Sequence, residues 1–184
     1  MSPIAMLGSM RVLLFISLLL ISMTGHGRQL VLIQGYLSDS SSWQAAGITQ
    51  QLRQQGWIFN GEYHYSSDGV RLYSRSTESR HSPPPNAYYQ VSLPTEASIA
   101  KQAFYLKAYL AHLRKSYPQQ PISLVGHSAG GIVARYVMVR NPELKVGQLI
   151  TIASPHLGTD SAEFGKMAGD SPLHCLHRCS VPVP

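Results

Sequence analysis

Short apolar runs alternate along this chain with segments whose apolar residues recur every three or four positions. The first run, residues 28–34, is rich in Leu, Val and Ile and ends at Gly35. Such runs are typical of strands buried inside a parallel sheet. Comparable runs predict further strands at 57–59, 88–93, 122–125 and 147–153.

Helical periodicity predicts three helices between these strands. The first covers residues 43–55 and ends at Gly56, the second opens after Pro94, and the third covers 129–140. The second has apolar residues spaced four-three-four-three, at Ile99, Ala103, Leu106, Leu110 and Leu113. Because strands alternate with helices, we expect an α/β fold with a mostly parallel sheet covered on both faces.

Two stretches have neither periodicity. Residues 62–87 are rich in Ser, Arg and Tyr and are interpreted as a long excursion loop, which could shape one side of a cleft. Residues 173–184 are interpreted as an irregular tail, in which Cys175 and Cys179 lie close to two histidines. Their spacing is too crowded for the usual zinc motif, so we expect no metal site.

The N-terminus has the pattern of a targeting segment. Arg11 precedes an almost unbroken apolar stretch at residues 12–23, and small residues follow it. This stretch is short for a membrane span, so residues 1–27 are predicted to be a signal peptide, with an uncleaved anchor as the alternative. We therefore expect the protein to be secreted or periplasmic, or else anchored in a membrane, with an α/β domain at 28–172.

Composition and charge limit the number of domains and the classes of partner. The 184 residues are 44% hydrophobic and 13% charged, which is ordinary for one globular domain. The formal net charge is +6, but the Lys and Arg residues form no long run and are not interleaved with aromatic residues. We therefore expect no nucleic-acid partner. The mild basic excess is compatible with contact to an anionic membrane surface, and the oligomeric state stays open.

The chemistry is concentrated in the sequence Gly126-His127-Ser128-Ala129-Gly130. It follows a predicted strand and opens a predicted helix, which is the context of a nucleophile elbow. Glycines on both sides leave room where strand and helix pass close together. Ser128 is therefore the candidate nucleophile, and the helix directs its positive N-terminal end at any oxyanion that forms there.

An oxyanion hole needs two backbone N–H groups. The residue after the nucleophile, Ala129, is the first candidate donor. The second should come from the loop after the first strand, Gln34 to Leu37, where Gly35 permits a sharp turn. We predict that the backbone N–H of Tyr36 is this second donor.

Three segments resemble bacterial secreted lipases and esterases of the α/β-hydrolase family: residues 31–36, 124–131 and 150–159. The resemblance runs from about Arg28 to Pro172. It implies a Ser–Asp–His triad, no cofactor, and a lipid or small ester as substrate. The family commonly has His-Gly where this chain has Gln34-Gly35, which alters the tuning of the site more than its mechanism.

The triad acid and base cannot be assigned from this pattern. The residues after Ser128 offer several carboxylates and imidazoles: Glu143, Asp160, Glu163, Asp170, His156, His174 and His177. Asp170 and His174 are only four residues apart, and no strand pattern separates them. The simplest hypothesis is a C-terminally truncated α/β-hydrolase that lacks its last strands. A serine ester hydrolase is the leading expectation, and the alternatives are an inactive fragment of one and a non-catalytic, membrane-associated binding module.

Overall fold

A six-stranded sheet forms the centre of the computed structural model, which describes residues 27–74, 84 and 86–158. The strand order is β3-β2-β4-β1-β5-β6. All neighbours are parallel except β2 and β3. The strands are β1 (Arg28–Ile33), β2 (Ile58–Ser66), β3 (Gly69–Tyr73), β4 (Asn86–Val91), β5 (Ile122–His127) and β6 (Val146–Ile152). The predicted α/β class with a mostly parallel sheet is confirmed.

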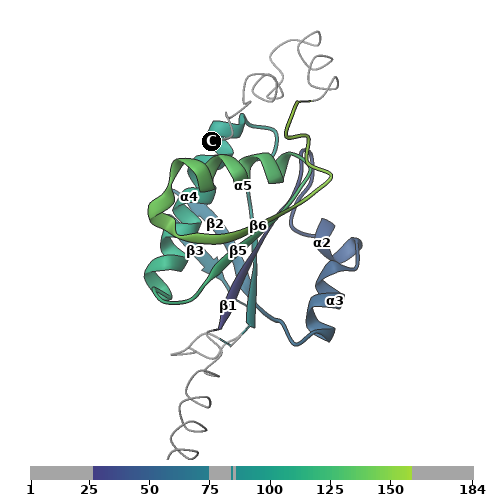
Figure 1. The fold of residues 1–184 in the computed structure, drawn as a ribbon, viewed down its shortest axis with the longest axis vertical. Helices are drawn as coiled ribbons and strands as arrows, with labels where there is room; N and C mark the ends of the chain where they lie inside the picture. Colours follow the sequence, from purple (N-terminus) through teal and green to yellow (C-terminus); the bar gives the residue numbers. More distant parts are fainter. Residues whose placement is uncertain (1–26, 75–83, 85, 159–184) are drawn as a thin grey trace, which may run out of the picture.

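Helices cover both faces of this sheet (Figure 1). One layer consists of α4 (Ile99–Ser116) and α5 (Ala129–Arg140), and a 3₁₀ turn, η1 (Pro142–Leu144), follows α5. The short helices α2 (Ser42–Ala45) and α3 (Ile48–Gln54) cover the other face. Because successive strand residues point to opposite faces, β1 contributes Val31 and Ile33 to the larger core and Leu30 and Leu32 to the smaller one.

Helix α4 shows why the predicted apolar stripe forms a helix here. Ser98 caps it by accepting a hydrogen bond from the Lys101 N–H at 3.3 Å, which satisfies one of the unpaired N–H groups of the first turn. The residues of the predicted stripe are all buried: Ile99, Ala103, Leu106, Leu110 and Leu113. Burial of this stripe against the sheet is the main source of the helix's stability.

The prediction of a single helix at residues 43–55 was wrong, because two short helices form there. Gly47 adopts a left-handed conformation, with φ of 74°, and divides the segment into α2 and α3. Gly tolerates this conformation because it has no Cβ. The break lets Trp43 of α2 pack into the smaller core, where Ile48 and Leu52 of α3 also pack.

The excursion loop expected at residues 62–87 was wrong over much of its length. Strand β2 continues to Ser66, turns at residues 67–68, and returns as β3 in an antiparallel hairpin. Tyr63 and Tyr65 face α4, while Glu62 and His64 face the opposite side of the sheet. The sequence therefore did contain the two-residue alternation that is typical of a strand. Strand β4 then starts at Asn86, and residues 75–83 and 85 lie outside the described part.

Arg114, near the end of α4, joins two connecting segments. Its guanidinium donates to the carbonyl oxygens of Leu144 at 3.1 Å, Lys145 at 3.0 Å, Pro118 at 3.0 Å and Gln120 at 2.8 Å. Burial lowers the pKa of the guanidinium, which nevertheless stays charged. One side chain thus ties the α4–β5 loop to the start of β6.

We expect Arg114→Met to lower the free energy of unfolding by about 2 kcal/mol, because four carbonyl groups lose a charged donor while the apolar stem is kept. Urea unfolding followed by circular dichroism measures this loss. Lys115→Met is the control, since Lys115 is exposed and adjacent. Equal stability of the two variants would contradict the role of Arg114.

The predicted targeting segment and tail lie almost wholly outside the described residues. Within the described ranges, no helix combines the length and apolar character needed to cross a membrane. The expectations of a signal peptide or anchor at 1–27 and an irregular tail at 173–184 therefore stay predictions.

Candidate active site

Ser128 lies in the sharp turn between β5 and α5, at the carboxyl edge of the sheet. Its φ of 51° and ψ of −127° are strained for a residue with a side chain. Its own N–H donates to the carbonyl of Ile152 at 2.9 Å, which anchors the turn to the end of β6. The geometry is that of a strand–turn–helix elbow with a half-buried serine at its tip.

The elbow glycines are required by close backbone contacts. A Cβ on Gly126 would lie 2.4 Å from the Cα of Gly131, and one on Gly130 would lie 2.3 Å from the carbonyl oxygen of Gln34. Neither neighbour is a flexible side-chain end that could move aside. The two glycines therefore let α5 approach both β5 and the loop after β1.

That loop, residues 34–37, lies directly against Ser128. A Cβ on Gly35 would come within 3.0 Å of the Ser128 Cβ. The Ser38 hydroxyl donates to the Gly35 carbonyl at 3.1 Å, and the Thr95 hydroxyl donates to the Ser38 carbonyl at 3.3 Å. Ser38 and Thr95 were not predicted to contribute to the site, although a Ser three positions after a turn Gly often bonds the backbone locally.

The two expected oxyanion donors belong to the two segments that meet at Ser128. Ala129 is the first residue of α5, and Tyr36 follows Gly35 in the adjoining loop. In the described part of the chain, neither backbone N–H donates to a backbone carbonyl. First-turn N–H groups of a helix have no partner within that helix, so Ala129 can donate to an external oxygen atom. The oxyanion role of both groups stays a prediction.

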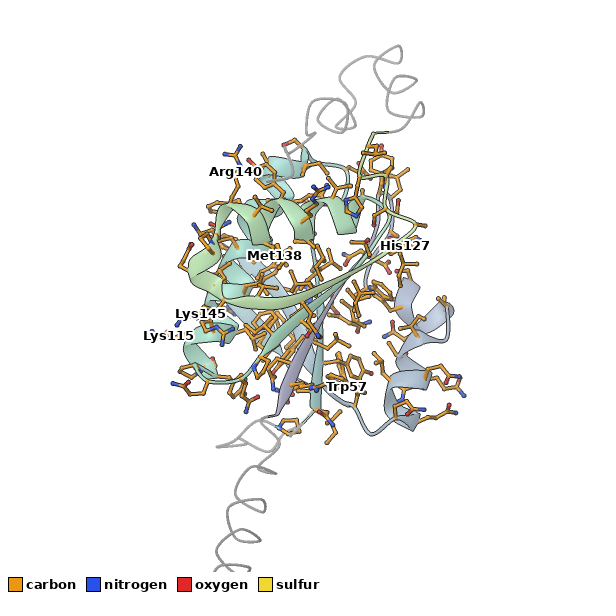
Figure 2. All side chains as sticks on the ribbon, viewed as in Figure 1. Trp57, Lys115, His127, Met138, Arg140 and Lys145 are labelled. Atoms are coloured by element: carbon orange, nitrogen blue, oxygen red, sulfur yellow. The ribbon has the colours of Figure 1, made fainter. Side chains whose placement is uncertain are left out.

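The described histidines near the elbow have other contacts. His127 is exposed, and its ring stands edge-on to Trp43 of α2, with centroids 6.5 Å apart. Figure 2 shows His127 and Arg140 at opposite ends of the layer formed by α5. The Nε2 of His156 lies 3.1 Å from the Thr151 hydroxyl. Among the described residues, Ser128 Oγ has no hydrogen-bond partner.

The other candidate triad residues are not brought to Ser128 by the described part of the chain. Glu143 pairs with Lys107 at 3.6 Å in the helical layer. The remaining candidates lie outside the described residues: Asp160, Glu163, Asp170, His174 and His177. The triad acid and base therefore stay unassigned.

His156 has a lowered pKa, because burial disfavours its charged form and Arg135 adds repulsion. The unfolded chain keeps the ordinary value of 6.5 and so binds the proton at higher pH. The titration of His156 should therefore lower the free energy of unfolding as the pH falls from 6.5 toward the pKa of His156 in the folded protein. We expect His156→Gln to reduce the stability lost between pH 7.5 and 5.5 in urea unfolding; an unchanged loss would contradict the shift.

Gln34, which stands where the resembling family has histidine, is buried in this arrangement, with 2% of its surface exposed. Its Oε1 has no hydrogen-bond partner among the described residues. Its backbone carbonyl meets the start of α5 at Gly130. Gln34 therefore acts on the site chiefly through its backbone, which sets the distance between the loop and the elbow.

An open polar depression of about 440 Å³ adjoins the same loop. Its wall is formed mainly by hydroxyl side chains with two carboxylates: Leu37, Ser38, Asp39, Ser41, Ser42, Thr95 and Glu96. Hydrogen bonds from Ser41 lower the pKa of Asp39, so this carboxylate is negative at neutral pH. The lining favours neutral polar or cationic groups over anions.

Metal-ligating side chains do not gather in the described ranges. No group of three or more His, Cys, Asp or Glu residues there could hold a metal ion. The crowded Cys175 and Cys179 segment is outside them.

Comparison with known proteins places this geometry in a family. The PGAP1-like alpha/beta domain matches residues 46–165. Triacylglycerol lipases from Pseudarthrobacter phenanthrenivorans and Burkholderia plantarii are each 37% identical over 59 residues, or 32% of this chain. That stretch covers 18% and 16% of the two lipases, so the chain spans less than a fifth of these curated relatives.

Solved structures share the fold at low identity. The mature form of Bacillus licheniformis lipase BlEst2 gives a TM-score of 0.54 at 18% identity, covering 77% of this chain and 46% of the lipase. A gene product of Listeria innocua gives 0.57 at 19% identity, covering 73% and 54%. These two likenesses show the fold. With the match over residues 46–165, the chain belongs to the PGAP1-like α/β domain family and has a lipase-like α/β-hydrolase fold.

Proposed function

We propose that the protein is a serine ester hydrolase in which Ser128 is the acyl nucleophile. The observation that carries the proposal is the elbow itself. Ser128 is held at a positive φ at the start of α5, and Gly35 brings a second loop with an available N–H against its Cβ. Such strain is retained where the surrounding structure fixes a functional group.

In the proposed reaction, Ser128 Oγ attacks the carbonyl carbon of an ester and gives up its proton to a base. The N–H groups of Ala129 and Tyr36 stabilise the oxyanion that forms, aided by the positive end of α5. The C–O bond to the alcohol breaks, the alcohol leaves with a proton, and water then hydrolyses the acyl-enzyme. No cofactor takes part in this scheme.

The proton acceptor is proposed to come from the residues after 158. The family order is serine, acid, base, and the carboxylates and imidazoles of that region follow Ser128 in the chain. His127 contacts Trp43 and His156 contacts Thr151, so neither of these two imidazoles near the elbow bonds Ser128. The mechanism therefore depends on a part of the protein beyond the described sheet.

A lipid ester is the proposed substrate class. The support is the local identity to two triacylglycerol lipases. The apolar stretch at residues 12–23 supports export to the periplasm or the medium, where such substrates are met. Membrane attachment by that stretch is the alternative location.

A second candidate function has one observation in its favour. Within the described residues no base contacts Ser128 Oγ, so a catalytically impaired member of the family, or a non-catalytic module attached to membranes, would also show this elbow. Without a base, the oxyanion donors and substrate binding alone would leave only residual catalysis.

Hydrolysis of p-nitrophenyl butyrate and of emulsified tributyrin separates these candidates. The proposal predicts release of butyrate from both esters and no release of p-nitrophenol from a p-nitrophenyl glycoside. Folded protein, verified by circular dichroism, that cleaves neither ester would favour the impaired or non-catalytic candidate.

A further inference from the structure

Three aromatic rings pack together on the surface between α4 and the β2–β3 hairpin. We call Tyr65, Phe104 and Tyr105 the α4 aromatic patch; their ring centroids are 5.9, 5.0 and 5.6 Å apart. Phe104 remains 59% exposed and Tyr65 42% exposed, while Tyr105 is half-buried against the larger core. Clustered exposed rings on one surface indicate an interaction site more strongly than scattered ones do.

The patch lies at the same edge of the sheet as the nucleophile. The strand registers place Tyr63 level with Gly126. Tyr65 lies two residues further along β2, and Ser128 lies two residues after Gly126, in the turn that follows β5. Three strand spacings separate β2 from β5 in the sheet, or about 14 Å. Phe104 lies in the second turn of α4, which begins at this same edge. A surface that touches the patch would therefore lie beside Ser128.

The charged residues of α4 beside the patch are basic. Lys101 and Lys107 lie three residues before and after Phe104, on the same exposed side of α4. Neither α4 nor α5 contains an acidic residue. Glu143 pairs with Lys107 at 3.6 Å, which leaves Lys101 as the unpaired cation next to the rings among the described residues.

We propose that the α4 aromatic patch docks the protein on an anionic lipid bilayer, with Phe104 and Tyr65 entering the headgroup layer and Lys101 binding lipid phosphates. The proposal rests on the lipid-ester function proposed above, because it orients Ser128 toward the layer that contains the substrate. Aromatic rings flanked by lysines are the residues that favour a bilayer interface. Anionic headgroups complement the lysines, and this complementarity selects a bilayer over a second copy of the basic chain.

A local fluorescence probe tests the docking in the full chain. Phe104→Trp places an indole at the patch, and vesicles of phosphatidylglycerol and phosphatidylcholine with brominated acyl chains quench an inserted indole. The local readout separates this contact from any binding by residues 12–23. We expect a blue shift and quenching at position 104 beyond the background of Trp43 and Trp57, and much less with phosphatidylcholine alone.

Tyr73→Trp is the matched control. Tyr73 is 56% exposed, lies on the same hairpin, and faces the opposite side, where its ring contacts His64 at 4.9 Å. Its indole should remain unquenched. Equal quenching at the two positions, or no quenching at position 104 of a folded variant, would overturn the proposal. Sedimentation tests the other occupant, a second copy of the chain. A dimeric parent protein that becomes monomeric on Phe104→Gln would also overturn the proposal.

Charge variants test the lysine component. Removing one cation near an anionic surface should lower the docking equilibrium about fivefold, so Lys101→Gln should reduce the quenching of the indole at position 104. Lys115→Gln is the control, because Figure 2 shows Lys115 on the side of the molecule away from His127. Equal effects of the two variants would contradict docking through the patch. Hydrolysis of the soluble ester p-nitrophenyl butyrate by these variants reports on Ser128 separately, so failed docking and failed catalysis remain distinct results.

Discussion

Replacing Ser128 with alanine is expected to lower kcat/KM for p-nitrophenyl butyrate on the order of 10⁴-fold or more, to the level set by substrate binding and the oxyanion donors. The reason is specific: the acyl-enzyme needs Oγ, and the variant keeps the backbone N–H groups of Ala129 and Tyr36. Initial rates over a range of ester concentrations measure the change.

The variant should remain folded, because the half-buried Ser128 side chain makes no hydrogen bond within the described residues. Thermal unfolding followed by circular dichroism serves as the check. Ser116→Ala is the matched control, since Ser116 is an exposed serine at the end of α4 whose hydroxyl donates to the His112 carbonyl. Activity that survives in Ser128→Ala but not in Ser116→Ala would contradict the proposed role.

Gly126→Ala is expected to cost about 3 kcal/mol or more in the free energy of unfolding. Its Cβ would lie 2.4 Å from the Cα and 2.6 Å from the N of Gly131, inside the first turn of α5. Both atoms are backbone, so strand and helix would have to separate. Separation would also move Ser128 away from Gly35, so ester hydrolysis should fall together with stability.

Gly147→Ala provides the comparison for this effect. Gly147 lies in β6, and a Cβ there would meet its nearest neighbour, the Ile122 carbonyl oxygen, at an ordinary 3.8 Å. We expect its free energy of unfolding to stay within about 1 kcal/mol of the parent. Urea denaturation at equilibrium measures both variants. Similar destabilisation by the two alanines would show that the elbow contact is not the cause.

The regular elements of the layer that holds the elbow were predictable from periodicity alone. Helix α5 spans residues 129–140 as expected, and the strands before and after it match within about two residues. These segments carry strong signals, because buried parallel strands are continuously apolar and α4 buries one clean stripe. The α/β class followed from their alternation.

The hairpin and the broken helix were missed for physical reasons. Strand β2 alternates Tyr with Glu, His and Ser, so its polar composition hid a period of two that Tyr63 and Tyr65 maintain. The Asp68-Gly69 pair was a turn signal between two short strands. At Gly47 the helical pattern continues on both sides, and the left-handed conformation of Gly47 breaks the helix where Trp43 packs into the smaller core.

The candidate site, too, was only partly predictable from the sequence. The elbow was predictable, since a glycine-flanked serine between a strand and a helix has few other uses. The contact between Gly35 and Ser128 joins residues far apart in sequence, so it depends on the parallel pairing of β1 with β5. The positioning bonds of Ser38 and Thr95 depend on the same neighbouring loops.

The most direct test of the central claim is the site of phosphonylation by a fluorophosphonate probe. The probe replaces its fluoride with the oxygen of an activated serine, and peptide mass spectrometry locates the adduct. The account predicts an adduct on the peptide that contains Ser128, absent in Ser128→Ala and retained in Ser116→Ala. Folded parent protein that stays unlabelled, or is labelled at another residue, would contradict the claim that Ser128 is an activated nucleophile.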